Sequence, residues 1–400
     1  MKSNSLRQCA AFLLLSFIFS ACIKEIKPVG AAQVAQANGL VNTLDVNCIP
    51  NGIQFFKTEE LSLARSNPVG IGLNNKVLFV EGDKRIPGPF FVPCGRVDIY
   101  NTTSDSWTHK ILREDVVNNV VAGKTDFALA AAGTKIGIAG GVFQIDAKRS
   151  DRVDIYDVNA DSWTVSQMSV RRVEAAGVGY GNFLYFAGGF GNNNKLHKSI
   201  DVYNTLNGSW SQLNLSMARY GLAAAATNNK ILFAGGETGG QVTDLVDIYD
   251  VPTGTWTTSA VSQPRTGMVA AALGNLIFFG GGFDIFPDGN PHLFYDIVDI
   301  YNTSTGQWSV THIPNATGWY QSAVQGTKMF FINRGFEGQP VEVDMYDVCS
   351  NSWGTLSLTD GRIILGVGAA GGKVLFGGGA LPNIVVKTVD IFDLGPLISP

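Results

Sequence analysis

A recurring arginine offers the clearest potential for ligand chemistry in this sequence. The guanidinium group is a planar fork of N–H donors that matches the two oxygens of a carboxylate or a sulfate. Arginines that converged on one point could therefore hold an anionic ligand. They could also belong to a repeated framework and donate to loop carbonyls, which is the interpretation that we favour. The residues concerned are Arg65, Arg172, Arg219, Arg265 and Arg362.

Aromatic residues in two long segments form a second group of candidate ligand contacts. Phe90 and Phe91 lie in DKRIPGPFFVPCG, and Phe286 and Tyr295 lie in FDIFPDGNPHLFY. Exposed rings in such segments could stack on a sugar or pack against a protein, whereas buried rings would stabilise their own unit. Both interpretations stay open at this point.

Other residue types give little indication of catalysis. The four histidines lack metal-ligand spacing, and the sequence contains no phosphate-binding loop, nucleophile elbow or zinc motif. We therefore expect no metal and no cofactor, and a binding protein fits the sequence better than an enzyme does. The net charge of −4, without a basic stripe, argues against a nucleic-acid partner.

A repeated sequence pattern predicts the secondary-structure elements that carry these residues. Six phrases such as RVDIYDVNADSW place an Asp nine residues before a Trp, and a seventh, TVDIFDL, lacks the Trp. Each phrase follows an apolar run such as KILFAGGE, most of which end in a Gly pair, and short stretches of small residues such as LAAAAT precede most of the runs. Short apolar runs bounded by turn residues are typical of buried strands. The repeat therefore predicts a unit of four strands, named a to d in chain order.

Two features of the unit indicate how the units pack. The small residues suit a strand a in the innermost position of a radial array, where neighbouring strands crowd around a central channel. The text rich in Asn, Asp and Gly before each Trp suits a c–d hairpin of fixed length. A unit of about 45–60 residues has the length of a propeller blade.

The Gly pair after an apolar strand, with Tyr and Trp at fixed spacing behind it, resembles the kelch repeat. The resemblance covers Ile53 to Leu394 and implies an all-β propeller of four-stranded antiparallel blades. VEGD in the first unit and INRG in the sixth lack the Gly pair, so we expect distorted b strands there. The kelch-propeller copper oxidases need two His and a Cys-linked Tyr, which we do not recognise here, so that resemblance is limited to the fold.

The missing seventh Trp indicates how the ring closes. No text for a strand d follows TVDIFDL, whereas NGIQFFKTEELSLAR near the N-terminus resembles a turn, a strand d and an exit loop, with Ile53 in the Trp position. We expect this segment to pair with the last strand c, because closure removes exposed sheet edges. The ring then has seven blades. A ring of six blades with one degenerate unit is the less economical alternative.

Loop lengths indicate where binding would occur. The c–d turns have one length, whereas the b–c connections and the d–a segment LREDVVNNVVAGKTD vary, and both kinds lie on one face of an up-and-down blade. Variable loops on a rigid scaffold commonly carry binding sites. We therefore expect this face to bind a protein or a glycan. The enzymatic alternative resembles a sialic-acid mutarotase, also a kelch propeller, whose anionic substrate would suit the arginines.

The N-terminal residues indicate export. A basic start, the apolar run Ala10–Phe19 and two small residues form a signal-peptide pattern. Cys22 follows directly and resembles the lipid-modified cysteine of bacterial lipoproteins. The resemblance implies a signal peptide over 1–21, a lipid-attached tether over 22–50 and the propeller over 51–400, in a protein anchored to a membrane of the cell envelope. Ordinary cleavage near VGAAQ would instead give a secreted protein.

Three cysteines remain if Cys22 carries a lipid, namely Cys48, Cys94 and Cys349. An odd number allows one disulfide at most in an exported protein. We favour three unpaired thiols, although the spacing does not exclude one pair.

The lipid assignment predicts the behaviour of a single substitution. Cys22→Ala should lose the label from a fatty-acid analogue and leave the membrane fraction, because stable anchoring needs the several acyl chains attached at this residue. Cys94→Ala serves as the control and should keep the label. Label that persists in Cys22→Ala, or that is absent from the unaltered protein, contradicts the assignment.

Overall fold

The computed structural model describes the chain over the following residues: 52–85, 91–112, 116–117, 120–121, 123–143, 147–285, 291–314, 320–333, 342–363, 366–381 and 384–394. These ranges are all-β apart from one 3-10 turn at Asn192–Asn194. They contain no helix that is long and apolar enough to cross a membrane. Cys22, Cys48, Phe90 and Phe286 lie outside the described residues.

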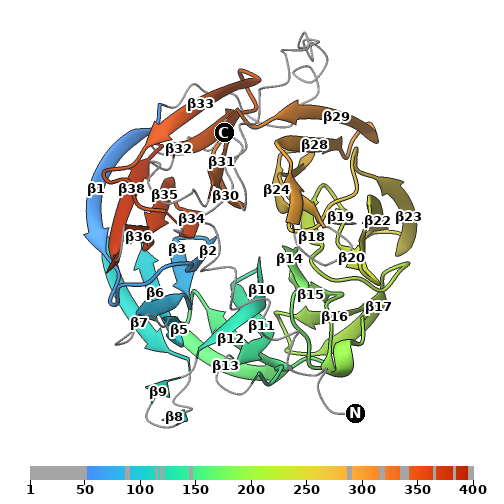
Figure 1. Cartoon of the computed structure of the whole chain (residues 1–400), viewed down its shortest axis with the longest axis horizontal. Helices are drawn as coiled ribbons and strands as arrows, with labels where there is room; N and C mark the ends of the chain where they lie inside the picture. Colours follow the sequence, from blue (N-terminus) through green and yellow to red (C-terminus); the bar gives the residue numbers. More distant parts are fainter. Residues whose placement is uncertain are drawn as a thin grey trace. The chain divides into compact units, whose positions relative to one another are not determined.

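Seven four-stranded antiparallel sheets, the blades, follow one another around a ring (Figure 1). Each blade pairs its strands in the order a, b, c, d. Blades 1 to 4 consist of β2 (Val69–Leu73), β3 (Lys76–Val80), β6 (Arg96–Asn101) and β7 (Ser106–Ile111); β10 (Lys124–Ala132), β11 (Lys135–Phe143), β12 (Arg152–Asp157) and β13 (Ser162–Gln167); β14 (Ala176–Tyr180), β15 (Phe183–Ala187), β16 (Ser199–Asn204) and β17 (Trp210–Asn214); and β18 (Ala223–Thr227), β19 (Lys230–Ala234), β22 (Leu245–Asp250) and β23 (Thr255–Ala260).

The remaining three blades repeat the same pattern, and they confirm the prediction of a seven-bladed ring. They consist of β24 (Val269–Leu273), β25 (Leu276–Gly280), β28 (Ile297–Asn302) and β29 (Gln307–His312); β30 (Tyr320–Gln325), β31 (Lys328–Asn333), β32 (Glu342–Asp347) and β33 (Ser352–Ser357); and β34 (Gly366–Ala370), β35 (Lys373–Gly377), β38 (Thr388–Asp393) and β1 (Gln54–Glu60).

Strand a contains small residues because the innermost strands of neighbouring blades almost touch. A Cβ atom on Gly177 of β14 would lie 2.1 Å from the carbonyl oxygen of Leu129 in β10. A Cβ atom on Gly70 of β2 would lie 1.9 Å from the carbonyl oxygen of Val367 in β34. Both distances are far inside van der Waals contact, so this crowding explains why an alanine- and glycine-rich segment forms a strand.

The c–d turns have one length because one backbone position in each is left-handed. The residue two before the Trp has a positive φ, for example +48° at Asp161, a conformation that Asp, Asn and Gly adopt most readily. The side chain of Asp161 also accepts a hydrogen bond from the Tyr156 hydroxyl of strand c. The six residues at this position are Asp105, Asp161, Gly208, Gly254, Gly306 and Asn351.

The N-terminal strand closes the ring as predicted, but in a different register. β1 pairs antiparallel with β38, and Phe55 lies opposite Phe392 with their ring centroids 5.5 Å apart. In the other blades the Trp occupies this place opposite the Tyr of strand c. The assignment of Ile53 to the Trp position is therefore wrong. No c–d turn fixes the register of β1, and a bulge between Phe55 and Lys57 shifts it.

The b strands of blades 1 and 6 are regular, contrary to the expected distortion. β3 and β31 pair in continuous register with both of their neighbours. In blade 1 the left-handed positions that follow strand b belong to Glu81 (φ +56°) and Gly82 (φ +103°). The buried Glu81 carboxylate accepts the N–H of Gly95 at 2.8 Å, which stabilises a conformation that glycine provides in the other blades.

The cysteines differ from the favoured expectation of three unpaired thiols. Cys349 is disulfide-bonded, and its partner lies outside the described residues. Cys94 is a buried free thiol, and burial raises its pKa to about 11. Cysteine spacing alone does not reveal which two residues the fold brings together.

Ring closure predicts that the stability of the propeller depends on β1. Deleting residues 51–57 removes the partner of β38 and exposes its edge, which should lower the melting temperature by roughly 10 °C or more and promote aggregation. Deleting residues 23–46 is the matched control, because it keeps Cys48 and the whole of β1. Equal melting curves for the two deletions would contradict closure by this strand.

Candidate functional site on the hairpin face

The b–c and d–a connections lie together on one face of the ring, which we name the hairpin face. Neighbouring hairpins contact each other there in two places: β21 contacts β26, and β37 contacts β4. The opposite face, the turn face, carries the a–b and c–d turns. The hairpins are β4–β5 (Asp83–Arg85, Phe91–Pro93), β8–β9 (Val116–Val117, Val120–Val121), β20–β21 (Glu237–Thr238, Gln241–Val242), β26–β27 (Phe283–Ile285, Pro291–Phe294) and β36–β37 (Ala380–Leu381, Ile384–Val385).

The five recurring arginines of the sequence have 0% exposed surface. Each forms an ion pair with the strand c Asp of its own blade: Arg65 with Asp98, Arg172 with Asp201, Arg219 with Asp247, Arg265 with Asp299, and Arg362 with Asp390. In blade 4 the N–O distance is 2.8 Å, and a second Arg219 nitrogen donates to the carbonyl of Phe233 at 3.0 Å. The arrangement favours the structural interpretation of these arginines.

Blade 2 replaces this arginine with a lysine, which sequence inspection did not identify. Lys124 is buried and its ammonium group donates to the carbonyl of Gly140 at 2.7 Å, as Arg172 does to Gly188 in the next blade. The carboxylate of Asp154 in strand c forms an ion pair with Arg152, and the N–O distance is 2.6 Å. Blade 2 therefore uses two cations, Lys124 and Arg152, for the contacts that one arginine makes in the other blades whose arginine is described.

The predicted aromatic contacts are only partly described. Tyr295 is half-buried and its backbone N–H donates to the carbonyl of Gly282 at 2.9 Å, while Phe91 lies in β5. Among the hairpin residues whose side chains are described, the exposed apolar ones are aliphatic. Leu293 of β27 is 51% exposed and Ile384 of β37 is 57% exposed. Both escaped the sequence analysis because isolated aliphatic residues carry no motif.

A stack of three side chains crosses blades 2 to 4 on the hairpin face. The Arg149 guanidinium lies 4.6 Å from the ring centroid of Phe190, and Phe190 meets Tyr220 edge to face at 4.9 Å. All three are half-buried. Tyr220 also hydrogen-bonds to Glu237, and burial together with this carboxylate raises the pKa of Tyr220. The sequence did contain one signal for this stack. Tyr220 directly follows the recurring arginine of blade 4, whereas Thr266 occupies the corresponding position in blade 5.

An acidic group lies beside this stack. Glu174 adopts a left-handed conformation (φ +51°). Its backbone N–H donates to the carbonyl of Asp126 at 3.0 Å, and its backbone carbonyl accepts the N–H of Gly221 at 3.0 Å. Burial, and then the charges of Asp126 and Glu237, raise the pKa of the Glu174 carboxyl to about 8, while Arg149 opposes this shift. The described residues contain no group of three or more His, Cys, Asp or Glu arranged to hold a metal ion.

The raised pKa of Glu174 predicts a pH-dependent stability. Between pH 4.5 and about 8 the folded chain holds a proton on Glu174 that the unfolded chain releases, so the free energy of unfolding falls as the pH rises. Glu174→Gln removes this contribution. Urea denaturation should show the unaltered protein losing about 1–3 kcal/mol relative to the variant between pH 5 and pH 8. Glu60→Gln, an exposed control, should follow the unaltered protein; parallel curves for all three would contradict the assignment.

Comparison with known families agrees with the geometry. The model of the KLHDC2/KLHL20/DRC7 Kelch-repeats domain matches residues 126–336, which is more than half of the 400 residues. No curated protein sequence matches the chain. The matched range begins at Asp126 of β10 and extends over blades 2 to 5, which contain three of the five buried arginines and most of the Gly pairs. This protein belongs to the kelch-repeat family of β-propellers.

Proposed function

We propose that this protein is exported, anchored to a membrane by a lipid on Cys22, and binds a protein partner through its hairpin face. The observation that carries the proposal is the separation of the two faces. The turn face repeats one c–d turn with the same left-handed position in six blades. The hairpin face concentrates the connections of different length and five hairpins. Binding sites are commonly built from such connections.

The exposed side chains of the hairpin face favour a protein rather than a glycan. Leu293 and Ile384 are aliphatic and more than half exposed, and aliphatic anchors fit pockets on a protein partner. The stack of Arg149, Phe190 and Tyr220 adds the residue types that are enriched in protein interfaces. Kelch propellers commonly mediate protein interactions, which agrees with this assignment.

The enzymatic alternative receives no comparable support from the described residues. It rested on arginines that would bind an anionic substrate. Their guanidinium groups are fully buried and engaged with the aspartates and carbonyls of their own blades. The observation that motivated the alternative therefore has an explanation within the framework of the fold.

The point at which the chain joins the ring suits an anchored binding protein. β1 begins at Gln54 opposite Asp393, the last residue of β38, and this end of the blade belongs to the turn face. A tether that precedes β1 therefore joins the ring on the side opposite the hairpins. The disulfide at Cys349 supports export, because disulfides persist mainly in oxidising compartments.

Site-specific crosslinking tests which face binds. A photoreactive amino acid at position 384 or 293 should capture a discrete partner in intact cells. The same group at Leu206, which is 76% exposed in a c–d turn, should not capture this partner. Once the partner is identified, Leu293→Ser and Ile384→Ser should each weaken its affinity about tenfold, as expected for anchor residues, with little change in the melting temperature.

The control Leu206→Ser should leave the affinity unchanged. The aromatic residues of the blade 1 loop extend the same prediction, since Phe90→Ala and Phe91→Ala should weaken binding of the same partner. Capture from position 206 together with unaltered affinity in the Leu293 and Ile384 variants would place binding on the turn face and overturn the proposal.

A further inference from the structure

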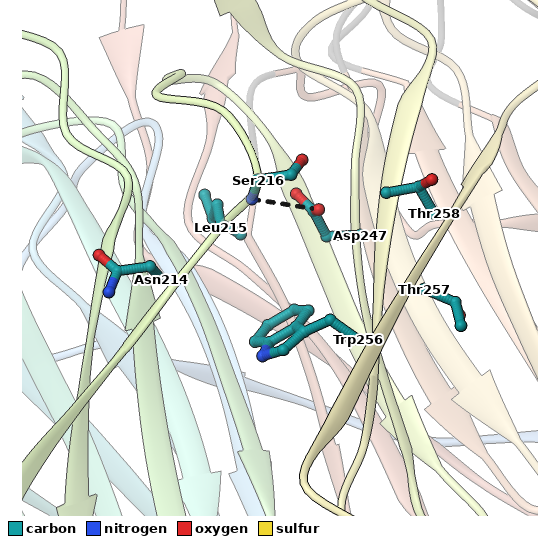
Figure 2. A pocket seen from close by; sticks show the side chains of 7 residues that line it. All are labelled: Asn214, Leu215, Ser216, Asp247, Trp256, Thr257 and Thr258. Atoms are coloured by element: carbon teal, nitrogen blue, oxygen red, sulfur yellow. Dashed lines mark hydrogen bonds between the residues drawn. The ribbon is translucent and has the colours of Figure 1, made fainter.

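A groove lies on the outer side of the ring between blades 3 and 4, and its lining residues Leu215 and Ser216 belong to a d–a connection of the hairpin face. It encloses about 310 Å³, at the lower end of the range for small-molecule sites. Figure 2 shows Ser216, Asp247 and Thr258 gathered at one end of the groove and the Trp256 indole at the other. The lining residues are Asn214, Leu215, Ser216, Asp247, Trp256, Thr257 and Thr258.

Three polar groups in this groove have no hydrogen-bond partner among the described residues, whereas their counterparts one blade earlier are all engaged. Between blades 2 and 3, Ser169 and Gln212 both donate to the strand c carboxylate Asp201, and the indole N–H of Trp210 donates to Ser166 at 2.7 Å. In the groove, no described residue accepts from or donates to the Ser216 hydroxyl, the Thr258 hydroxyl or the Trp256 indole N–H.

One substitution in the repeat releases the indole N–H of Trp256. In blades 3, 5 and 6 the acceptor for the Trp is a hydroxyl on strand d of the preceding blade, as in Trp210 to Ser166 and Trp308 to Ser259. The corresponding residue of β17 is Leu213, which lies opposite Ile200 as Ser166 lies opposite Val153. Leucine cannot accept a hydrogen bond, so the N–H of Trp256 is left available to a ligand.

The charges around the groove select against an anionic ligand. Asp247 is buried at its floor, where one oxygen accepts the Ser216 N–H at 3.2 Å and the other accepts Arg219 at 2.8 Å. Arg219 is 0% exposed, so its charge is directed into the blade. None of the lining residues presents an exposed cation. A ligand would therefore meet two hydroxyls, an indole N–H and an apolar ring, above a buried carboxylate that is paired with Arg219.

We propose that this groove binds one neutral pyranose unit of a saccharide. A pyranose combines an apolar C–H face, which suits the indole of Trp256, with hydroxyl groups that can pair with Ser216, Thr258 and the indole N–H. A peptide side chain would satisfy fewer of these groups within about 310 Å³. The site is distinct from the one proposed for the protein partner on the hairpin face, because it uses different residues.

Saturation-transfer NMR on the whole mature protein tests the site. The probes are lactose, maltotriose, cellotriose and N,N′,N″-triacetylchitotriose, with 3′-sialyllactose as the anionic comparison. At least one neutral saccharide should receive saturation at its ring C–H protons, and its affinity should exceed that of sialyllactose. Thr258→Val keeps the shape of the side chain and removes the hydroxyl, so the affinity should fall at least threefold.

Leu213→Ser should act in the same direction by a different route. It restores the acceptor found in the neighbouring blades, engages the Trp256 N–H, and should weaken saccharide binding at least threefold. Val310→Ala changes the position of blade 5 that corresponds to Thr258 and should have no effect. Absence of saturation transfer to all four neutral probes at 10 mM, or transfer that survives both groove substitutions unchanged, would overturn the proposal.

Discussion

The ring depends on the buried arginine that the structure describes in blades 1, 3, 4, 5 and 7. Its guanidinium pairs with the strand c Asp of its own blade, and its backbone carbonyl accepts an N–H from the Gly pair of the preceding blade. These backbone bonds measure 2.9 Å from Gly189 to Arg219 and 2.8 Å from Gly379 to Arg65, the junction that closes the ring. Removing one partner of such a pair would leave an uncompensated buried charge, which costs about 3–5 kcal/mol. One residue thus stabilises the inside of its blade and joins that blade to the preceding one.

This arginine–aspartate pair determines where the sequence is free to vary. The Asp also accepts a backbone N–H from the connection that precedes its blade, as Asp247 does from Ser216, so the start of each d–a connection is fixed as well. Variation is left to the tips of the connections and to the outward side chains of strand d. The hairpins of the hairpin face are variation at the tips of the connections. The groove at Trp256 is variation in the outward side chains of strand d, because its unpaired groups arise from Leu213 and Thr258 on outer strands.

Sequence reasoning reached the architecture because every blade repeats the same physical solution, but it failed where one residue takes over another's role. Glu81 replaces a glycine in a left-handed position, and Lys124 replaces a buried arginine, so neither position carries the residue by which the repeat is recognised. The register of β1 escaped prediction because a bulge rather than a turn sets it. The stack of Arg149, Phe190 and Tyr220 comes from three different blades, so its members are far apart in the sequence and share no motif.

The hairpin face and the groove meet at one residue pair. Asp247 forms the floor of the groove and holds Arg219, and the residue after Arg219 is Tyr220 of the stack. Such adjacency would couple two sites if the connecting residue had two alternative arrangements. Arg219 has 0% exposed surface and is held by Asp247, the Phe233 carbonyl and the Gly189 N–H at once, which leaves a single arrangement for it. A rigid arginine–aspartate pair of this kind would position both proposed sites without transmitting occupancy between them, so the proposed saccharide and the proposed protein partner are expected to bind together.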